Sequence, residues 1–101
     1  MLPFAAEAAD ELEAAAAWYE SERPGYGSLF LEEVARKAKL AARFPQSGTR
    51  VSGFDVGHDV RSFRIRRFPY SLVTAVVGGQ ATVFAVAHHS REPGYWCSRL
   101  R

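Results

Sequence analysis

The chain has 101 residues, 48% of them apolar, which suits one domain with a single core and not a disordered segment. Its one cysteine, Cys97, excludes an intrachain disulfide and a multi-cysteine metal site, and no stretch is long enough to cross a membrane. The net charge of +2 hides a division, because residues 1–33 carry eight acidic and one basic side chain and residues 34–101 carry three acidic and twelve basic ones. Either the basic part meets an anionic partner, or neighbouring elements neutralise one another.

The acidic first part of the chain predicts two helices joined by a short turn. Residues 5–20 are rich in Ala, Glu and Leu, contain no Gly or Pro, and place apolar side chains at helical spacing. The Pro and Gly residues within 23–27 end this helix, and a second one is expected from about residue 27 or 28 to Arg43. Glu32 and Glu33 precede Arg36 and Lys37 by four residues, so two ion pairs are expected on its outer face.

The second part of the chain predicts an antiparallel sheet. Residues 45–59 are rich in turn residues, with a possible short strand near Val51 or Phe54. Three strands are expected at residues 60–67, 70–77 and 81–88, the last two joined by Gly78-Gly79. The fold class is therefore α+β, a single domain over residues 1–101 in which a two-helix hairpin packs on one face of the sheet.

A row of arginines marks the first expected strand. If Phe63 and Ile65 face the helices, Arg64 and Arg66 project from the open face, roughly 6–7 Å apart, a spacing that suits adjacent phosphates or carboxylates. Arginines that only protect a sheet edge are the alternative. Arg61 belongs to the same row, and Arg91 is positioned to join this surface.

The two histidines at the end of the last strand must point to opposite faces. His89 shares a face with two small alanines, which would leave a shallow groove leading to it, so it is the better site candidate. His88 shares a face with Phe84 and Val86 and is expected to pack at the strand end. No third and fourth ligands are apparent, so no metal site is expected.

Two aromatic residues follow Pro93-Gly94 near the end of the chain. Tyr95 could stack on a base or fill a notch beside the helices. Trp96 is expected to anchor the C-terminal segment. The start of the chain lacks the basic and apolar regions of a signal peptide, which indicates a cytoplasmic protein.

Four segments together resemble the RelE/ParE superfamily, the toxins of bacterial type II toxin–antitoxin pairs. They are Glu-Leu-Glu-Ala-Ala-Ala-Ala-Trp-Tyr at residues 11–19, Phe-Pro at 44–45, the arginine-rich run at 60–70, and Ala-Val-Ala-His-His through Pro-Gly-Tyr-Trp at 85–96. The resemblance implies two helices on an antiparallel sheet, usually with a first strand before the helices. Only residues 1–4 are available for that strand, so it is expected to be short or missing.

Members of the superfamily have one of two activities, so the resemblance implies two alternatives for this chain. RelE-like members cut ribosome-bound messenger RNA, and in that case His89 and Tyr95 would be catalytic, with the four arginines Arg61, Arg64, Arg66 and Arg91 binding phosphate. ParE-like members are not enzymes and poison DNA gyrase by binding it. Nucleases often carry an arginine where this chain has Ser71, and losing one phosphate-stabilising donor costs on the order of a hundredfold in rate. A ParE-like protein is therefore favoured.

The resemblance also implies a protein partner. The toxin would be neutralised by a cognate antitoxin that is acidic and partly disordered, with which it can form a hetero-oligomer. No cofactor is expected. Two alternatives are a non-toxic family member that keeps only antitoxin binding, and a small RNA-binding module that uses the open sheet face.

Overall fold

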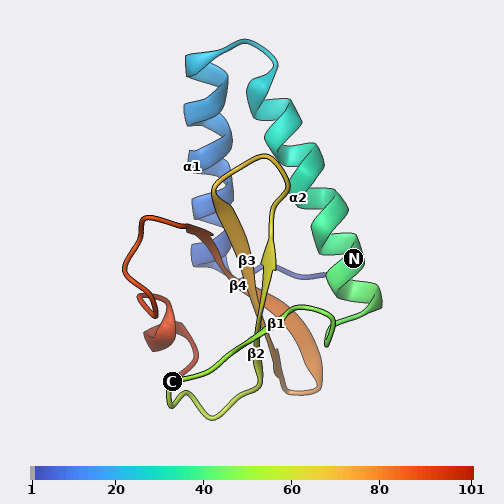
Figure 1. Cartoon of the computed structure of the whole chain (residues 1–101), viewed down its shortest axis with the longest axis vertical. Coiled ribbons are helices and arrows are strands. Elements are labelled where there is room, and N and C mark those ends of the chain that lie inside the picture. The colour runs from blue at the N-terminus through green and yellow to red at the C-terminus, as the bar shows by residue number, and fades with distance from the viewer. Residues whose placement is uncertain (1) are drawn as a thin grey trace.

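The computed structural model describes residues 2–101, in which a helical hairpin is followed by a four-stranded sheet (Figure 1). The helices and strands are α1 (Ala6–Glu22), α2 (Tyr26–Arg43), β1 (Thr49–Val51), β2 (Val60–Arg64), β3 (Tyr70–Val77) and β4 (Gln80–His88), and a short 3₁₀ helix, η1 (Cys97–Arg99), closes the chain. The predicted helices and the last two strands are confirmed to within two residues, and β1 forms at the possible strand near Val51. The α+β prediction is confirmed.

The sheet has the order β1-β2-β3-β4, and each neighbouring pair is antiparallel. Before α1, the chain touches the outer edge of β4 in a single parallel bridge between Phe4 and Val83. The amide of Ala5 donates to the carbonyl of Val83 at 2.8 Å, and the amide of Val83 donates to the carbonyl of Pro3 at 2.9 Å. The first strand of the expected fold is therefore present but very short; Met1 lies outside the described residues.

A β-bulge in β4 decides which side chains face the helices. Leu72 pairs with Val86, but Thr74 pairs with Val83, so β4 holds one residue more than β3 between these pairs. Val83 and Val86 therefore both pack against the helices, whereas Phe84 packs on the other face. The prediction that Phe84 shares a face with Val86 is wrong, because the bulge interrupts the two-residue alternation.

Aromatic rings fix the helices to the sheet. Tyr19 of α1 and Phe30 of α2 both meet the buried ring of Phe68, with centroids 4.9 and 5.0 Å apart and near-perpendicular planes. Tyr70 on β3 contacts Phe30 in the same manner at 5.1 Å. Such edge-to-face pairs contribute beyond the area they bury. This cluster continues into the largely aliphatic core between the helices and the sheet, formed by Ala8, Val34, Ala38, Phe63, Ile65, Leu72, Val83 and Val86.

The turn between the helices is held by one carboxylate and two glycines. Glu20 accepts hydrogen bonds from the amides of Gly25 at 2.9 Å and Gly27 at 3.1 Å, which satisfies the free amides that begin α2. Gly25 has a φ of 85°, a left-handed conformation that glycine adopts readily. A Cβ on Gly27 would lie 2.5 Å from the carbonyl oxygen of Ala16, so only glycine allows the two helices to approach this closely.

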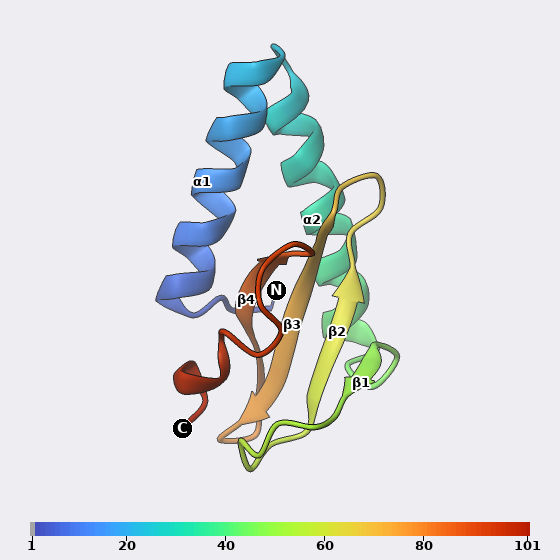
Figure 2. The same cartoon turned by 60° about the vertical axis from the view of Figure 1, so that its left-hand side comes forward.

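The face of the sheet opposite the helices is half covered. A second apolar cluster joins the loop before β2, the sheet and the C-terminal segment, and comprises Val56, Val60, Val73, Ala75, Ala85, Trp96, Cys97 and Leu100. In Figure 2 the C-terminal segment crosses the sheet on the side away from α2. The prediction that Trp96 anchors this segment is confirmed, since only 4% of its surface is exposed. The expectation of an open face holds only for the remaining part of the sheet.

Candidate functional site

The uncovered part of the sheet face carries His89 in a shallow hollow. Ser71 hydrogen-bonds the Nε2 atom of His89 at 2.8 Å, and the backbone amide of His89 donates to the carbonyl of Pro69 at the same distance. The hollow has a volume of about 240 Å³, and its lining includes Ser62, Val73, Ala87, Tyr95 and Trp96. The small side chain of Ala87 leaves the space beside His89, as the sequence predicted.

The surroundings of His89 favour the neutral form of its ring. Burial lowers its pKa below the ordinary value, and the nearby positive charge of Arg64 lowers it further. Arg64 is exposed and pairs in register with Ser71, so guanidinium, hydroxyl and imidazole lie on one face of the sheet. This constellation can donate hydrogen bonds to an anionic group, with one permanent cation beside it.

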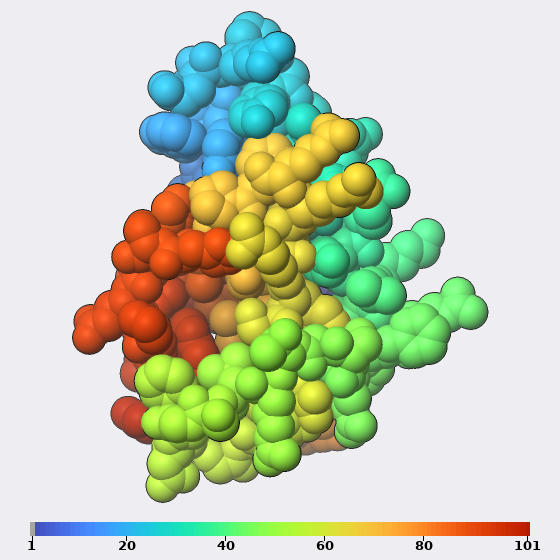
Figure 3. Space-filling model, in the orientation of Figure 1, coloured from blue at the N-terminus to red at the C-terminus, as the bar shows by residue number. Residues whose placement is uncertain are grey.

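Arg66 does not accompany Arg64 on this face. β2 ends at Arg64, and the next residues form a turn in which Arg67 has a φ of 74°. Arg66 instead lines a hollow along α2, and in Figure 3 the segment after β2 (yellow) projects beside that helix. The predicted pair of guanidiniums on one strand face is therefore wrong, because the two-residue alternation stops with the strand.

Arg61 serves the fold. It lies on the helix side of β2, half buried, where its Nη1 donates to the carbonyls of Gln46 at 3.1 Å and Gly48 at 3.3 Å. Its Nη2 pairs with Asp59 at 3.2 Å. With these partners, Arg61 clamps the loop that follows α2 to the sheet and is not placed to bind phosphate beside His89.

Arg91 stacks on Tyr95. The guanidinium carbon of Arg91 lies 3.9 Å from the centroid of the Tyr95 ring, a cation–π contact. Arg91 lines both the hollow beside His89 and a second groove on the other side of the C-terminal segment. It is therefore an exposed cation at the boundary of two concave surfaces.

The hydroxyl of Tyr95 belongs to a network centred on Glu11 of α1. Tyr95 donates to Glu11 Oε2 at 2.7 Å, and the amide of Val86 donates to Glu11 Oε1 at 3.0 Å. Arg99 makes two hydrogen bonds to the same carboxylate, at 2.9 and 3.1 Å, and its Nη1 also donates to the carbonyl of Phe84 at 2.9 Å. Glu11 and Arg99 thus satisfy backbone groups at the edge of β4 and tie the C-terminal segment to α1.

This network shifts two pKa values. Burial raises the pKa of Tyr95, and the hydrogen bond and negative charge of Glu11 raise it further, to about 12. Burial alone would raise the pKa of Glu11, but the hydrogen bonds from Arg99, Tyr95 and Val86 outweigh it and hold this pKa below the ordinary value of 4.5. The Tyr95 hydroxyl therefore stays protonated near pH 7 and donates its hydrogen bond to Glu11.

Acidification is expected to remove the contribution of Glu11 to stability. Because its folded pKa is depressed, that contribution is full above pH 4.5 and declines as the pH falls through the folded pKa. Melting temperatures from pH 7 to pH 3 should therefore fall less steeply in Glu11→Gln than in the natural chain. Glu13→Gln, which changes an exposed carboxyl of the same helix, is the control and should keep the steep profile. Equal slopes for the natural chain and Glu11→Gln would contradict this assignment.

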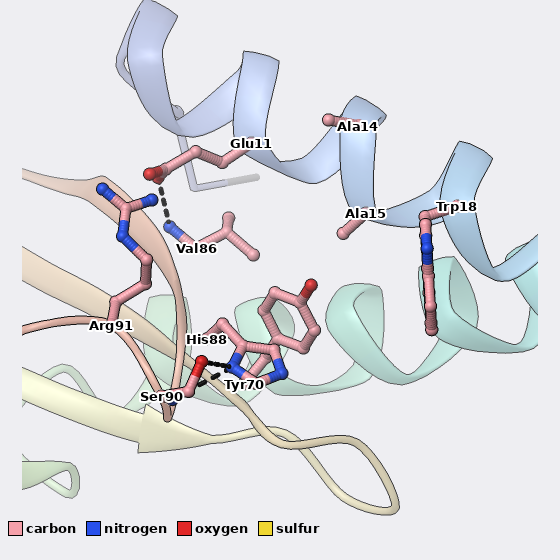
Figure 4. Close-up of a pocket in the computed structure, with 9 residues that line it drawn as sticks. All are labelled: Glu11, Ala14, Ala15, Trp18, Tyr70, Val86, His88, Ser90 and Arg91. Carbon is pink, nitrogen blue, oxygen red and sulfur yellow. Dashed lines mark hydrogen bonds between the residues drawn. The ribbon is translucent and has the colours of Figure 1, made fainter.

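A groove of about 370 Å³ separates α1 from the end of β4 (Figure 4). Its floor includes Ala14 and Ala15, and Trp18 stands at its rim with 57% of its surface exposed. His88 lies across from them, its ring 4.9 Å from that of Tyr70 and its Nδ1 accepting from the amide of Ser90 at 3.0 Å. His88 therefore packs at the strand end, as predicted.

The structure also bears on metal and membrane sites. Within residues 2–101, no three His, Cys, Asp or Glu side chains are grouped so that they could hold a metal ion. No helix of these residues combines the length and hydropathy needed to span a bilayer.

The sequence did not single out Glu11 and Arg99 as site residues, although they attach the C-terminal segment around Tyr95 to α1. They are 88 residues apart, and each is one of many like-charged residues in its part of the chain. The one available signal was an acidic residue within the apolar spacing of α1, one position before Leu12.

A helical hairpin on one face of an antiparallel sheet is the architecture that the resemblance to the RelE/ParE superfamily implied. Residues 2–93 match the family model of the ParE toxin of type II toxin-antitoxin system, parDE. The chain belongs to this ParE toxin family.

A solved structure supports the fold. It is described as "Chromosomal ParDE TA system from P. aeruginosa", and one of its chains matches with a TM-score of 0.73 and 20% sequence identity. The match covers 86% of this chain and 92% of that one. A search of curated proteins found no significant match.

Proposed function

We propose that this chain acts in the cytoplasm as a ParE-like toxin, which arrests growth by binding an essential protein such as DNA gyrase and is neutralised by a cognate antitoxin. Membership of the ParE family supports the toxin class, and the related fold belongs to a structure of a ParDE system. The hydrogen bonding of Tyr95 and the small number of cations beside His89 favour binding over catalysis.

The state of Tyr95 is the observation that carries the proposal. Its hydroxyl donates a hydrogen bond to Glu11 Oε2 at 2.7 Å, and its pKa of about 12 leaves it protonated throughout the physiological pH range. A general acid or base works best with a pKa near the operating pH and within reach of the reacting group. Tyr95 does not meet the pKa condition, and its hydrogen bond to Glu11 attaches the C-terminal segment to α1.

The hollow beside His89 is also poor in cations. RNA cleavage by a 2′-hydroxyl builds negative charge on the phosphate, which the site must stabilise with fixed donors. Ser71 stands where the resemblance to the nucleases leads one to expect an arginine. Arg66 lines the hollow along α2, and Arg61 is held by Gln46, Gly48 and Asp59. Among residues 2–101, Arg64 pairs in register with Ser71 on this face, and Arg91 lines the rim of the hollow. This arrangement favours a protein-binding toxin.

Two assays with purified components test the proposal. The chain is expected to inhibit DNA supercoiling by gyrase in proportion to its concentration, and to leave messenger RNA intact on purified ribosomes. Inhibition should disappear when the antitoxin is added. Cleavage of the messenger RNA within the ribosomal A site, with unimpaired supercoiling, would overturn the proposal.

RNA cleavage is the second candidate, and one observation favours it. The lowered pKa of His89 favours a neutral ring, and this ring lines the hollow and hydrogen-bonds Ser71, so it could accept a proton from a 2′-hydroxyl. If this reaction occurs, His89→Ala should abolish cleavage while the melting temperature stays close to that of the natural chain. A chain that neither cleaves RNA nor arrests growth would be a non-toxic family member, and one that binds RNA without harm would be an RNA-binding module.

A further inference from the structure

Nine of the thirteen basic side chains lie in two segments of the chain that contain no acidic residue. Residues 34–54 hold five of them, and residues 60–79 hold four. A surface on which one sign of charge is concentrated attracts ligands of the opposite sign. The fold brings basic residues of both segments to one surface along α2.

That surface is a hollow of about 510 Å³, which we name the α2 hollow. Its lining residues are Glu33, Arg36, Lys37, Lys39, Leu40, Arg43, Phe44 and Arg66. All but Arg66 come from α2 and its C-terminal end. Arg66 comes from the turn after β2, which lies beside α2 in Figure 3. Ile65 and Phe68 are buried and fix this turn on the sheet, and Arg66 is exposed between them.

Four of the five cations in the α2 hollow have no acidic partner within residues 2–101. No carboxylate of this range lies within ion-pair distance of Lys37, Lys39, Arg43 or Arg66. Lys39 and Arg43 are four residues apart on α2, about 6 Å along the helix axis, a spacing that suits adjacent phosphates. These four side chains are therefore available to an anionic ligand.

The acidic side chain of the α2 hollow is buried and paired. Glu33 has 7% of its surface exposed, and its Oε1 accepts from Arg36 Nε at 3.2 Å. Neither the predicted pair of Glu32 with Arg36 nor that of Glu33 with Lys37 forms within residues 2–101, because Glu33 is buried and takes Arg36 as its partner. With five cations and one carboxylate, the lining has a formal charge of +4.

Two apolar side chains of the lining are also exposed. Leu40 and Phe44 expose 42% and 52% of their surfaces. The backbone of DNA alternates anionic phosphates with deoxyribose rings, whose C–H faces are apolar. The α2 hollow therefore offers contacts to both parts of that backbone.

We propose that the α2 hollow binds the sugar–phosphate backbone of duplex DNA without reading its sequence. The four free cations pair with phosphates, and Leu40 and Phe44 pack against the sugars between them. This inference goes beyond the proposed function, because the contact requires neither the target nor the antitoxin. It would hold the chain on the DNA on which a target such as gyrase acts.

Duplex DNA fits this surface better than an acidic protein or a single strand. Five of the eight lining residues are cations, whereas the centres of protein–protein interfaces are depleted of charged residues. Single-strand binding relies on several aromatic faces that stack on successive bases. The lining has one aromatic ring, Phe44, and the guanidinium carbon of Arg43 lies 5.5 Å from its centroid.

The test measures the fluorescence anisotropy of a short labelled DNA duplex with the purified chain over a range of salt concentrations. The dissociation constant is expected to be on the order of 10⁻⁵ M near physiological salt. If the four free cations each neutralise one phosphate, the slope of the logarithm of the binding constant against that of the salt concentration should be about −3.6.

The variant Arg43→Gln/Arg66→Gln removes two of these phosphate contacts. The slope should change to about −1.8, and the affinity at low salt should fall at least about tenfold. Leu40→Ser should weaken binding without changing the slope. All three substitutions are at exposed positions, and melting curves check that the variants remain folded.

The matched control is Arg23→Gln/Arg101→Gln, which makes the same change in net charge. Both arginines are exposed, and neither lines the α2 hollow, since Arg23 precedes α2 and Arg101 ends the chain. This control should keep the natural slope and bind within about threefold of the natural chain.

Three results would overturn the inference. The first is equal slopes for the natural chain and Arg43→Gln/Arg66→Gln, or no binding of the duplex at low salt. The second is equal affinity for poly-glutamate, because an acidic protein would then be the occupant. The third is tighter binding of single-stranded RNA of the same length.

The failures of the two proposals are distinguishable, because DNA binding is measured with the purified chain alone. If the natural chain binds the duplex but does not arrest growth, the proposed function fails and this inference stands. If it arrests growth and does not bind the duplex, the proposed function stands and this inference fails.

Discussion

Glu11→Ala is expected to lower the free energy of unfolding by about 3 kcal/mol, because it leaves Arg99 without its carboxylate and the edge of β4 without its acceptor. For a domain of this size, that loss corresponds to a fall in melting temperature on the order of 15 °C. The C-terminal segment should loosen first, since Tyr95 and Arg99 both hold it through Glu11. Thermal melts and hydrogen exchange of residues 94–101 measure the two effects.

Glu13→Ala is the control for this substitution. Glu13 is an exposed carboxylate on the same helix, and no ion pair is formed by it within the described residues. Removing it should change the unfolding free energy by less than about 0.5 kcal/mol. Equal melting temperatures for the two variants would show that the Glu11 network does not stabilise the fold.

Trp96→Ala is expected to cost about 3–5 kcal/mol, because Trp96 is the largest side chain in the cluster that covers the sheet opposite the helices. Its ring meets that of Phe54 at 5.7 Å and so joins the C-terminal segment to the loop before β2. Its loss should expose apolar residues of the sheet, measured as increased binding of a hydrophobic dye together with a lower melting temperature.

The second tryptophan provides a matched comparison. Trp18 undergoes the same change of side chain in Trp18→Ala, but 57% of its surface is exposed at the rim of the groove in Figure 4. This substitution should cost less than about 1 kcal/mol and leave dye binding unchanged. A cost as large as that of Trp96→Ala would contradict the division between an anchoring and an exposed tryptophan.

The order of the elements, and the bounds of the two helices and of β3 and β4, could be predicted because local chemistry determines them. Alanine-rich helical spacing, the glycines at 25 and 27, and the β-branched runs around Gly78-Gly79 all act within a few residues. The short bridge between Phe4 and Val83 agrees with the expectation of a short or missing first strand.

The faces of the strands were harder to predict. The bulge at Phe84 reverses the alternation of β4, and nothing in an apolar run marks which residue is extra. The two faces of β3 and β4 are both covered in part, so both carry apolar side chains and the pattern does not separate them. The end of β2 at Arg64 had a similar effect, because it moved Arg66 from the sheet face to α2.

The chemistry of Tyr95 could not be predicted from the sequence at all. Whether its hydroxyl is free or bound depends on Glu11, which is 84 residues away, and on Arg99 beside it. Long-range pairs of this kind form only after the helices and the C-terminal segment have packed on the same edge of β4. In the structure the Tyr95 hydroxyl attaches the C-terminal segment to α1, which supports the proposal that Tyr95 is not catalytic.

We propose that this chain arrests growth by binding a protein and not by cutting RNA. The direct test is to measure the growth of cells that express Tyr95→Phe or His89→Ala at protein levels matched to the natural chain. We expect both variants to arrest growth as the natural chain does, because neither side chain takes part in a reaction. Restored growth with folded His89→Ala or folded Tyr95→Phe would contradict the claim.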